Sequence, residues 1–213
     1  MPRKAVGRAR TGSDRSYHHG DLRRTLLDVA LRLLEKFDPG HLSLRAIARE
    51  AGVSRAAPYH HFADREALLA AVAAEGFRAL RAAMVERVAS SEGNPLARMQ
   101  EMGVAYVLFA VRNPQLYRLM FGGELRDRER HEELARESGA TYAALGTAMQ
   151  ESMGNGSGGR GAPGEFALSA WALVHGLAML LVDQRVGEPD MSDHQVEALA
   201  RQATEVLGRG VAG

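Results

Sequence analysis

Residues 43–62, SLRAIAREAGVSRAAPYHHF, limit the possible folds of this chain more than any other segment. Ala48 is a small residue within a short helical pattern, and Gly52 follows it four positions later. A small side chain lets a second helix cross closely, and glycine readily adopts the positive φ that a tight turn requires. Ser43 and Ser54 precede the two helical patterns, where a serine hydroxyl can cap a first turn. The segment therefore predicts a helix-turn-helix, with the second helix running to about His60.

Helical periodicity continues on both sides of this segment. Leu22, Leu26, Ala30, Leu33 and Phe37 recur every three or four positions, so we expect them on one buried face of a helix that Asp21 caps and that runs to about Lys36. The later helices are expected from Asp64 to the loop at 90–94, from Asn94 to before Pro114, and over about 114–121, 126–153, 164–185 and 192–207, with a linker at 154–164. No alternation of period two is long enough to indicate a strand, so the predicted fold is all-α with about nine helices.

Charge is distributed unevenly along the chain, although its total is only +1. Residues 1–65 carry a net charge of +6, and the remaining residues carry −5. A basic head on an acidic body is expected when only the head meets a polyanion such as DNA. The alternative is a solvated basic tail, because five of these cations precede Ser16.

The chemistry of the helix-turn-helix supports the DNA interpretation. In such a motif the start of the second helix enters the major groove, where Arg55 can read guanine through two hydrogen bonds. Ala56 and Ala57 permit a close approach, while Tyr59 and His60 can reach phosphates. The alternative is that the tyrosine is core and the arginines are merely solvated. The candidate DNA-binding residues are Ser43, Arg45, Ser54, Arg55, Ala56, Ala57, Tyr59, His60 and Arg65.

Residues 18–69, from HHGDLRRTLL to ADREALL, closely resemble the DNA-binding domain of the tetracycline-repressor (TetR) family. Trp171, His175 and Gly176, together with NPQLYRLMF at 113–121, are similar to a subgroup of that family. The sequence departs from the family where Ala56-Ala57-Pro58 replaces a common Gly-Thr, and where Arg65 replaces a common lysine. Because proline lacks an N–H donor, Pro58 is expected to shorten the recognition helix.

The resemblance implies a homodimeric transcriptional regulator, usually a repressor, that binds a palindromic double-stranded DNA operator. It also implies that the last two helices form the dimer interface and that a small-molecule effector of unknown identity controls DNA binding. The expected organisation is a flexible basic arm at 1–17, a DNA-binding domain with three helices at 18–66, and an effector-binding and dimerisation domain at 67–213. The candidate effector-binding residues are Met102, Tyr106, Phe109, Tyr117, Phe121, Trp171 and His175.

Other activities are less well supported. The chain has no cysteine, so thiol chemistry and cysteine-ligated metals are excluded, and neither the histidine pairs nor the glycines at 154–159 predict a metal or cofactor. The apolar stretch Phe166–Val182 is shorter than a membrane span, and we expect a cytoplasmic protein without membrane contact. Two alternatives stay open: a DNA-binding protein whose C-terminal domain only dimerises or binds a protein partner, and an enzyme that uses His175 as a general base.

Overall fold

The computed structural model describes residues 22–92, 94–125, 127–153 and 163–212, and these ranges confirm the all-α prediction. They contain eight α-helices and three short 3-10 helices, labelled η. In chain order the elements are α1 (Leu22–Leu34), η1 (Pro39–His41), α2 (Leu44–Glu50), η2 (Ala57–His60), α3 (Arg65–Ala89), α4 (Pro95–Arg112), α5 (Pro114–Phe121), η3 (Arg128–Arg130), α6 (Glu132–Met153), α7 (Pro163–Val182) and α8 (Asp193–Ala212).

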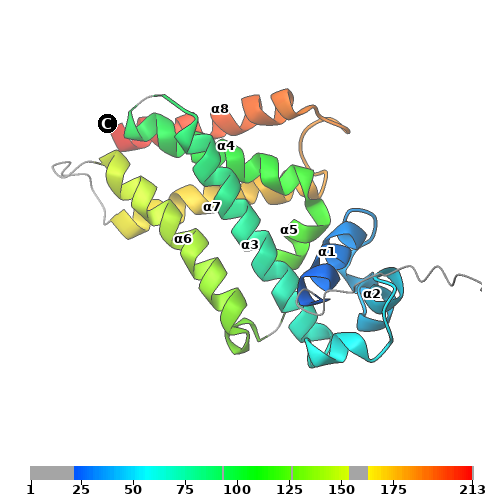
Figure 1. The fold of residues 1–213 in the computed structure, drawn as a ribbon. Helices are drawn as coiled ribbons and strands as arrows, with labels where there is room; N and C mark the ends of the chain where they lie inside the picture. The colour runs from blue at the N-terminus through cyan, green and yellow to red at the C-terminus, as the bar shows by residue number, and fades with distance from the viewer. Residues whose placement is uncertain (1–21, 93, 126, 154–162, 213) are drawn as a thin grey trace, which may run out of the picture.

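An N-terminal unit is formed by α1, α2 and η2, which lie together at one end of the molecule (Figure 1). Ile47 and Ala48 of α2 are fully buried, as their place at the predicted crossing requires. Gly52 has a φ of +68°, which confirms the predicted tight turn. The hydroxyl of Ser43 accepts a hydrogen bond from the N–H of Ala46 at 3.1 Å and caps α2 as expected.

The segment after the turn is less regular than the predicted helix. Residues 55 and 56 form a turn and only Ala57–His60 are helical, as the 3-10 helix η2. Ser54 was expected to cap this helix with its side chain, but η2 begins after Ala56 and has no side-chain cap. Pro58 lies inside the segment and has no N–H to donate, which explains why an α-helix does not form there and why the chain has eight α-helices in its described ranges rather than nine.

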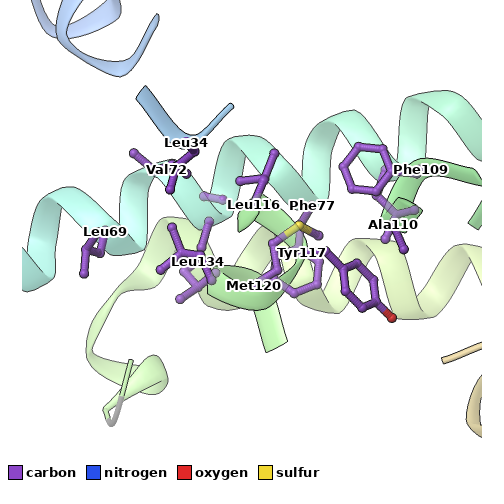
Figure 2. Close-up of a cluster of buried hydrophobic side chains, with 14 of the residues drawn as sticks. Leu34, Leu69, Val72, Phe77, Phe109, Ala110, Leu116, Tyr117, Met120 and Leu134 are labelled. Carbon is purple, nitrogen blue, oxygen red and sulfur yellow. The ribbon is translucent and has the colours of Figure 1, made fainter. Parts of the chain in front are cut away.

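The long helix α3 connects this unit to the larger domain (Figure 1). It is capped as predicted by Asp64, whose carboxylate accepts from the N–H of Ala67 at 2.8 Å. Its buried side chains, among them Leu69, Val72 and Phe77, pack with α5 and α6 in one hydrophobic core (Figure 2). Gly76 lets α5 approach closely, because a Cβ at this position would lie 2.6 Å from the sulfur of Met120.

The remaining helices complete the larger domain. Asn94 caps α4, and this helix ends at Arg112 before Pro114, as predicted. Gly103 of α4 lies close to α7 and α8, since a Cβ there would be 2.9 Å from Thr204 and 3.2 Å from Val174. Within the described residues, none of the helices has the length and apolar character that crossing a membrane requires.

Several predicted boundaries were wrong. The helix expected from residue 126 begins at Glu132, because the separate 3-10 turn η3 precedes it. Phe37 was expected on the buried face of the first helix, but α1 ends at Leu34 and Phe37 is 47% exposed. Asp21, the arm at 1–17 and most of the expected linker, residues 154–162, lie outside the described residues.

Candidate nucleic-acid interface and candidate ligand cavity

A basic hollow of about 510 Å³ lies on the surface of the N-terminal unit. It is lined by Arg45 and Arg49 of α2, by Arg55 after the turn, and by smaller side chains including that of Ser43. All three arginines are exposed. None of them forms an ion pair with any residue that the structure describes. The hollow is thus positively charged and open, as contact with phosphates requires.

The structure brings most of the predicted DNA-binding residues to this exposed surface. Ser54, Arg55 and Ala56 are exposed, and so is His60. Tyr59 is 52% exposed, which rules out the alternative that it is a core residue. Pro58 and Phe62 point the other way and are buried, so η2 is held against the unit by these two side chains.

Arg65 has contacts within the protein. Its guanidinium donates to the carbonyl oxygens of Leu42 at 2.8 Å and Pro39 at 2.7 Å, and it lies 3.6 Å from the carboxylate of Glu124. These contacts tie the start of α3 to the segment around η1. Arg65 therefore holds the helix-turn-helix in position, and its contact with phosphate stays a prediction.

Arg49 was missed by the sequence analysis. It follows Arg45 by four positions on α2, so both guanidinium groups lie on the same helical face. This spacing was visible in the sequence and would have identified the residue.

A second hollow, with a volume of about 450 Å³, lies in the larger domain, and we call it the aromatic cavity. Its wall contains five aromatic rings, those of Phe77, Tyr106, Phe121, Tyr142 and Trp171. Several of the rings meet edge to face, as Phe77 and Phe121 do at 5.2 Å and Tyr142 and Trp171 at 5.6 Å. Ser138, Gly139, Thr141 and Leu145 of α6 and Arg128 of η3 complete the wall. A volume of this size suits a small molecule.

Four polar side chains form a hydrogen-bonded cluster at one side of the cavity. The Trp171 indole N–H donates to the Tyr106 hydroxyl at 3.2 Å, and the Tyr117 hydroxyl donates to the same oxygen at 3.1 Å. Both hydroxyl groups also lie close to Nδ1 of His175, Tyr117 at 2.7 Å and Tyr106 at 3.0 Å. The cluster joins α4, α5 and α7 through groups that burial would otherwise leave without partners.

A count of hydrogens fixes the state of His175. The indole and the two hydroxyls supply three polar hydrogens, and an unprotonated Nδ1 provides the acceptor that completes their pairing. A proton on Nδ1 would leave one hydroxyl hydrogen without an acceptor in the cluster. Burial also lowers the pKa of His175, and it raises the pKa of Tyr106 to about 12. The cluster is therefore neutral at physiological pH.

The predicted effector-binding residues lie in three different places. Tyr106, Phe121 and Trp171 line the aromatic cavity. Tyr117 and His175 belong to the hydrogen-bonded cluster behind it. The remaining two, Met102 and Phe109, are buried in the core and are not part of the cavity wall.

Seven residues of the cavity wall were not predicted from the sequence, among them Phe77, Arg128 and Tyr142. Phe77 is an apolar residue of a long buried helix, and its position on a cavity had no signal in the sequence. Tyr142 follows the small pair Ser138-Gly139 on α6, and small residues near an aromatic residue are a weak sign of a cavity. Arg128 lies in η3, a segment that was expected to be part of a long helix.

An ionic layer connects the cavity wall to the N-terminal unit; it consists of Glu75, Arg78 and Arg81 of α3 and Glu133 and Glu137 of α6. Arg78 lies 3.2 Å from both Glu133 and Glu137, and Arg81 lies 2.8 Å from Glu137. Arg23 of α1 joins this layer through Glu133 at 2.5 Å. Helix α6 therefore contributes to the cavity on one face and pairs with α1 and α3 through its N-terminal half.

Comparison with known families gives two matches. Residues 26–72 match the family model described as bacterial regulatory proteins, tetR family. Residues 99–207 match the model described as the tetracyclin repressor-like C-terminal domain. Together the two matches include the helix-turn-helix and most of the aromatic cavity.

Individual relatives agree with these matches. A solved structure of a protein of unknown function from Rhodococcus sp. RHA1 is 37% identical, covers 94% of this chain and all of that one, and superposes with a TM-score of 0.80. The regulator FadR from Bacillus subtilis, solved with stearoyl-CoA, is 12% identical with a TM-score of 0.70 and coverage of 89% and 99%, and so shares the fold.

The nucleoid occlusion factor SlmA of Marinomonas sp. (strain MWYL1) is 32% identical over 101 residues, which are 47% of this chain. The match spans half the length of that curated relative.

Proposed function

The chain belongs to the TetR family of bacterial transcriptional regulators, a DNA-binding and non-enzymatic family, and we propose that it is a repressor released from its operator by a small molecule. Within this proposal, residues 18–66 bind DNA and residues 67–213 bind the effector and dimerise. His175 then has a structural role in the hydrogen-bonded cluster, in place of the alternative role of a general base. The Trp171, His175 and Gly176 motif is proposed to mark a subgroup of the family.

The three exposed arginines that form no ion pair with a described residue carry the DNA-binding part of the proposal. Arg45, Arg49 and Arg55 surround one hollow beside the exposed start of η2. We propose that Arg55 contacts a base edge and that Arg45 and Arg49, with the hydroxyl of Tyr59, contact phosphates. Each of these side chains is positioned by the Ala48 and Gly52 crossing described above.

A dimer follows from the family, and the proposed interface lies on α7 and α8. Leu168 and Leu180 of α7 are 53% and 44% exposed in the single chain, although both are large apolar side chains. Burial of such a surface against a second copy is favourable. A two-fold dimer places two recognition segments on a palindromic operator with half-sites about 34–36 Å apart.

The aromatic cavity supports the effector part of the proposal. If the C-terminal domain only dimerised or bound a protein, a solid core would serve equally well, whereas this domain contains a cavity of about 450 Å³. A ligand that displaced α6 would also displace Glu133, the partner of Arg23 on α1. This contact offers a route from the cavity to the helix-turn-helix.

The proposal is tested by fluorescence polarisation of DNA from upstream of the gene against scrambled DNA, over a series of salt concentrations. We expect specific binding by a dimer that weakens with salt, because phosphate contacts release counterions. Tyr59→Ala should abolish specific binding. Tyr142→Ala is the control, because Tyr142 is also an exposed tyrosine, at 41%, but lies on the cavity. Equal weak binding of both DNAs would contradict the assignment of the helix-turn-helix as a specific reader of that sequence.

A further inference from the structure

One arginine of the larger domain differs from its neighbours. Nearby, Arg130 pairs with Asp127, and Arg78 and Arg81 both pair with Glu137 of the ionic layer. Arg128 forms no ion pair with any described residue. It is partly buried, with its Cζ atom 5.5 Å from the ring centroid of Phe77, and it lies in the wall of the aromatic cavity.

Arg128 also has donors left over. Its Nη1 group donates to the carbonyl oxygen of Met120 at 2.6 Å, which uses one of the five N–H groups of a guanidinium. Burial lowers the pKa of Arg128, which shows that its surroundings oppose the charge without an anion to balance it. A partly buried cation of this kind gains from a charged hydrogen-bond partner.

The other polar groups of the wall already donate within the protein. The hydroxyl of Ser138 donates to the carbonyl of Ala135 at 3.2 Å, and that of Thr141 donates to the carbonyl of Glu137 at 2.8 Å. Tyr106 and Trp171 donate within the cluster with His175. Tyr142 is at the exposed rim. Among the described groups of the cavity wall, Arg128 is therefore the charged donor with unused N–H groups, and the hydroxyl of Tyr142 is a neutral one.

The chemistry of the wall limits the ligand further. Among the described residues the wall contains one cation and no aspartate or glutamate. A single guanidinium matches the two oxygens of a carboxylate, whereas a doubly charged phosphate would leave much of its charge unbalanced. The five aromatic rings suit an apolar body that contains a ring.

We infer that the aromatic cavity binds an apolar organic acid, whose carboxylate pairs with Arg128 and whose ring lies among Phe121, Tyr142 and Trp171. This inference rests on the proposed function in that it names the chemical class of the effector. It adds that Arg128 is the residue that selects the acid over neutral molecules of the same shape.

The experiment uses matched pairs of probes that differ only in charge, 4-phenylbutyrate with 4-phenylbutyramide and decanoate with decanamide. Trp171 is the single tryptophan of the chain and lines the cavity, so its fluorescence reports binding there directly. At least one acid should bind the wild-type protein about tenfold more tightly than its amide, the difference expected from one charge-assisted pair. The phenyl pair should bind more tightly than the decyl pair.

Variants separate the role of Arg128 from general effects on folding. In Arg128→Gln the preference for the acid should fall below about twofold, and Arg128→Lys should recover part of it. Arg130→Gln, the control, changes an exposed arginine two positions away and should keep the full preference. Gly139→Leu should weaken binding of both the acid and the amide of each pair. A Cβ at this position meets no atom within 4 Å, so the leucine side chain would occupy space in the cavity.

The inference is overturned if neither acid binds the wild-type protein more tightly than its amide, or if the preference for the acid persists in Arg128→Gln. Absence of any fluorescence response to all four probes at millimolar concentration also overturns it. DNA release is measured separately by polarisation. If an acid binds through Arg128 without releasing DNA, the effector-release proposal fails while the cavity assignment stands. If neutral compounds alone release DNA and no acid shows a preference that depends on Arg128, the effector-release proposal stands while the inference about the acid fails.

Discussion

The surface of the helix-turn-helix and the packed helices of the larger domain use arginine in different ways. On the N-terminal unit, Arg45, Arg49 and Arg55 surround a hollow and form no ion pair with the residues that the structure describes. In the larger domain, Arg78 and Arg81 of α3 each reach a glutamate of α6 within 3.2 Å. The comparison shows that the same side chain either joins two helices or stays open to an external anion, according to whether a carboxylate is near.

A second group of paired arginines supports this distinction. Arg87 of α3, Glu101 of α4 and Glu197 and Arg201 of α8 form a closed set of ion pairs, with Arg87 to Glu101 at 2.8 Å and Arg201 to Glu197 also at 2.8 Å. Hydrogen bonds from Arg87 and then Arg201 hold the pKa of Glu197 below its usual value. Arg128 lacks a described ion pair although it is partly buried and lines the aromatic cavity, which is why we propose it as the ligand contact.

The largest effect should come from removing the open arginines together. Arg45, Arg49 and Arg55 changed to Gln should weaken operator binding by at least about 100-fold, because three phosphate or base contacts are lost. The slope of log K against log salt should also fall by about one for each phosphate contact removed. Fluorescence polarisation over a salt series measures both quantities.

Arg98→Gln is the control for this triple variant, since Arg98 is exposed on α4, in the larger domain. The melting temperature of the triple variant should stay close to that of the wild-type protein, because the three arginines form no ion pair with a described residue. If the triple variant bound the operator with unchanged salt dependence, the distinction between open and paired arginines would lose its functional meaning.

A smaller effect, on folding rather than DNA binding, should follow from Glu137→Gln. Glu137 is 7% exposed and accepts charged hydrogen bonds from Arg81 at 2.8 Å and from Arg78 at 3.2 Å. Loss of its charge should lower the free energy of unfolding by about 2 kcal/mol, because Arg81 loses its described carboxylate partner and Arg78 keeps only Glu75 and Glu133. Urea denaturation at pH 7 measures the change.

The pH dependence provides a check on this prediction. Hydrogen bonds from Arg81 and then Arg78 lower the pKa of Glu137 in the folded state. Its contribution to stability is therefore complete above the unfolded pKa of about 4.3 and is lost as the pH falls through the folded pKa. The difference between wild type and variant should shrink in this acid range. Glu132→Gln, at an exposed position of the same helix without a described ion pair, should show little change at any pH.

The smallest effect concerns the neutral cluster, which contains no arginine. Burial lowers the pKa of His175, so the unfolded chain takes up a proton here at a higher pH than the folded chain does. Stability should consequently fall as the pH drops below the unfolded pKa of about 6.5, by up to about 1.4 kcal/mol per pH unit until the folded pKa is reached. His175→Asn keeps an acceptor near the Nδ1 position and should reduce this slope. Thermal melts between pH 7 and pH 5 compare the two proteins.

The seven other histidines contribute to both proteins, so the test is the difference in slope. His194→Asn is a suitable control, because His194 is exposed on α8 and should leave the slope unchanged. Equal slopes for wild type and His175→Asn would show that protonation of the cluster costs nothing in the folded state.

Local chemistry predicted the frame of the molecule well. Ser43, Asp64 and Asn94 each cap the helix that the sequence assigned to them, because a cap depends on residues three positions away. Gly52 adopts the expected positive φ, which is also a local property because it depends on glycine having no Cβ. The shortening of the recognition segment was also predicted from a local feature, the proline at position 58.

The cavity was less predictable because it depends on distant contacts. Met102 and Phe109 are residue types that occur in cores and in cavity walls alike, as are Tyr106 and Trp171. In the structure the first two lie in the core, whereas the other two line the cavity. The partner of each arginine is likewise set by packing between helices far apart in the chain, as with Arg81 and Glu137. A count of charges cannot show which arginine lacks such a partner.

The ionic layer between α3 and α6 also has a consequence for warming. The cost of removing charged groups from water falls as temperature rises, so ion-pair networks retain more of their strength when the protein is heated than isolated polar contacts do. Glu133 and Glu137 place such a network at the helix that forms one wall of the cavity. The shape of that wall should therefore persist close to the melting temperature, and the cavity should lose its form only when the whole domain unfolds.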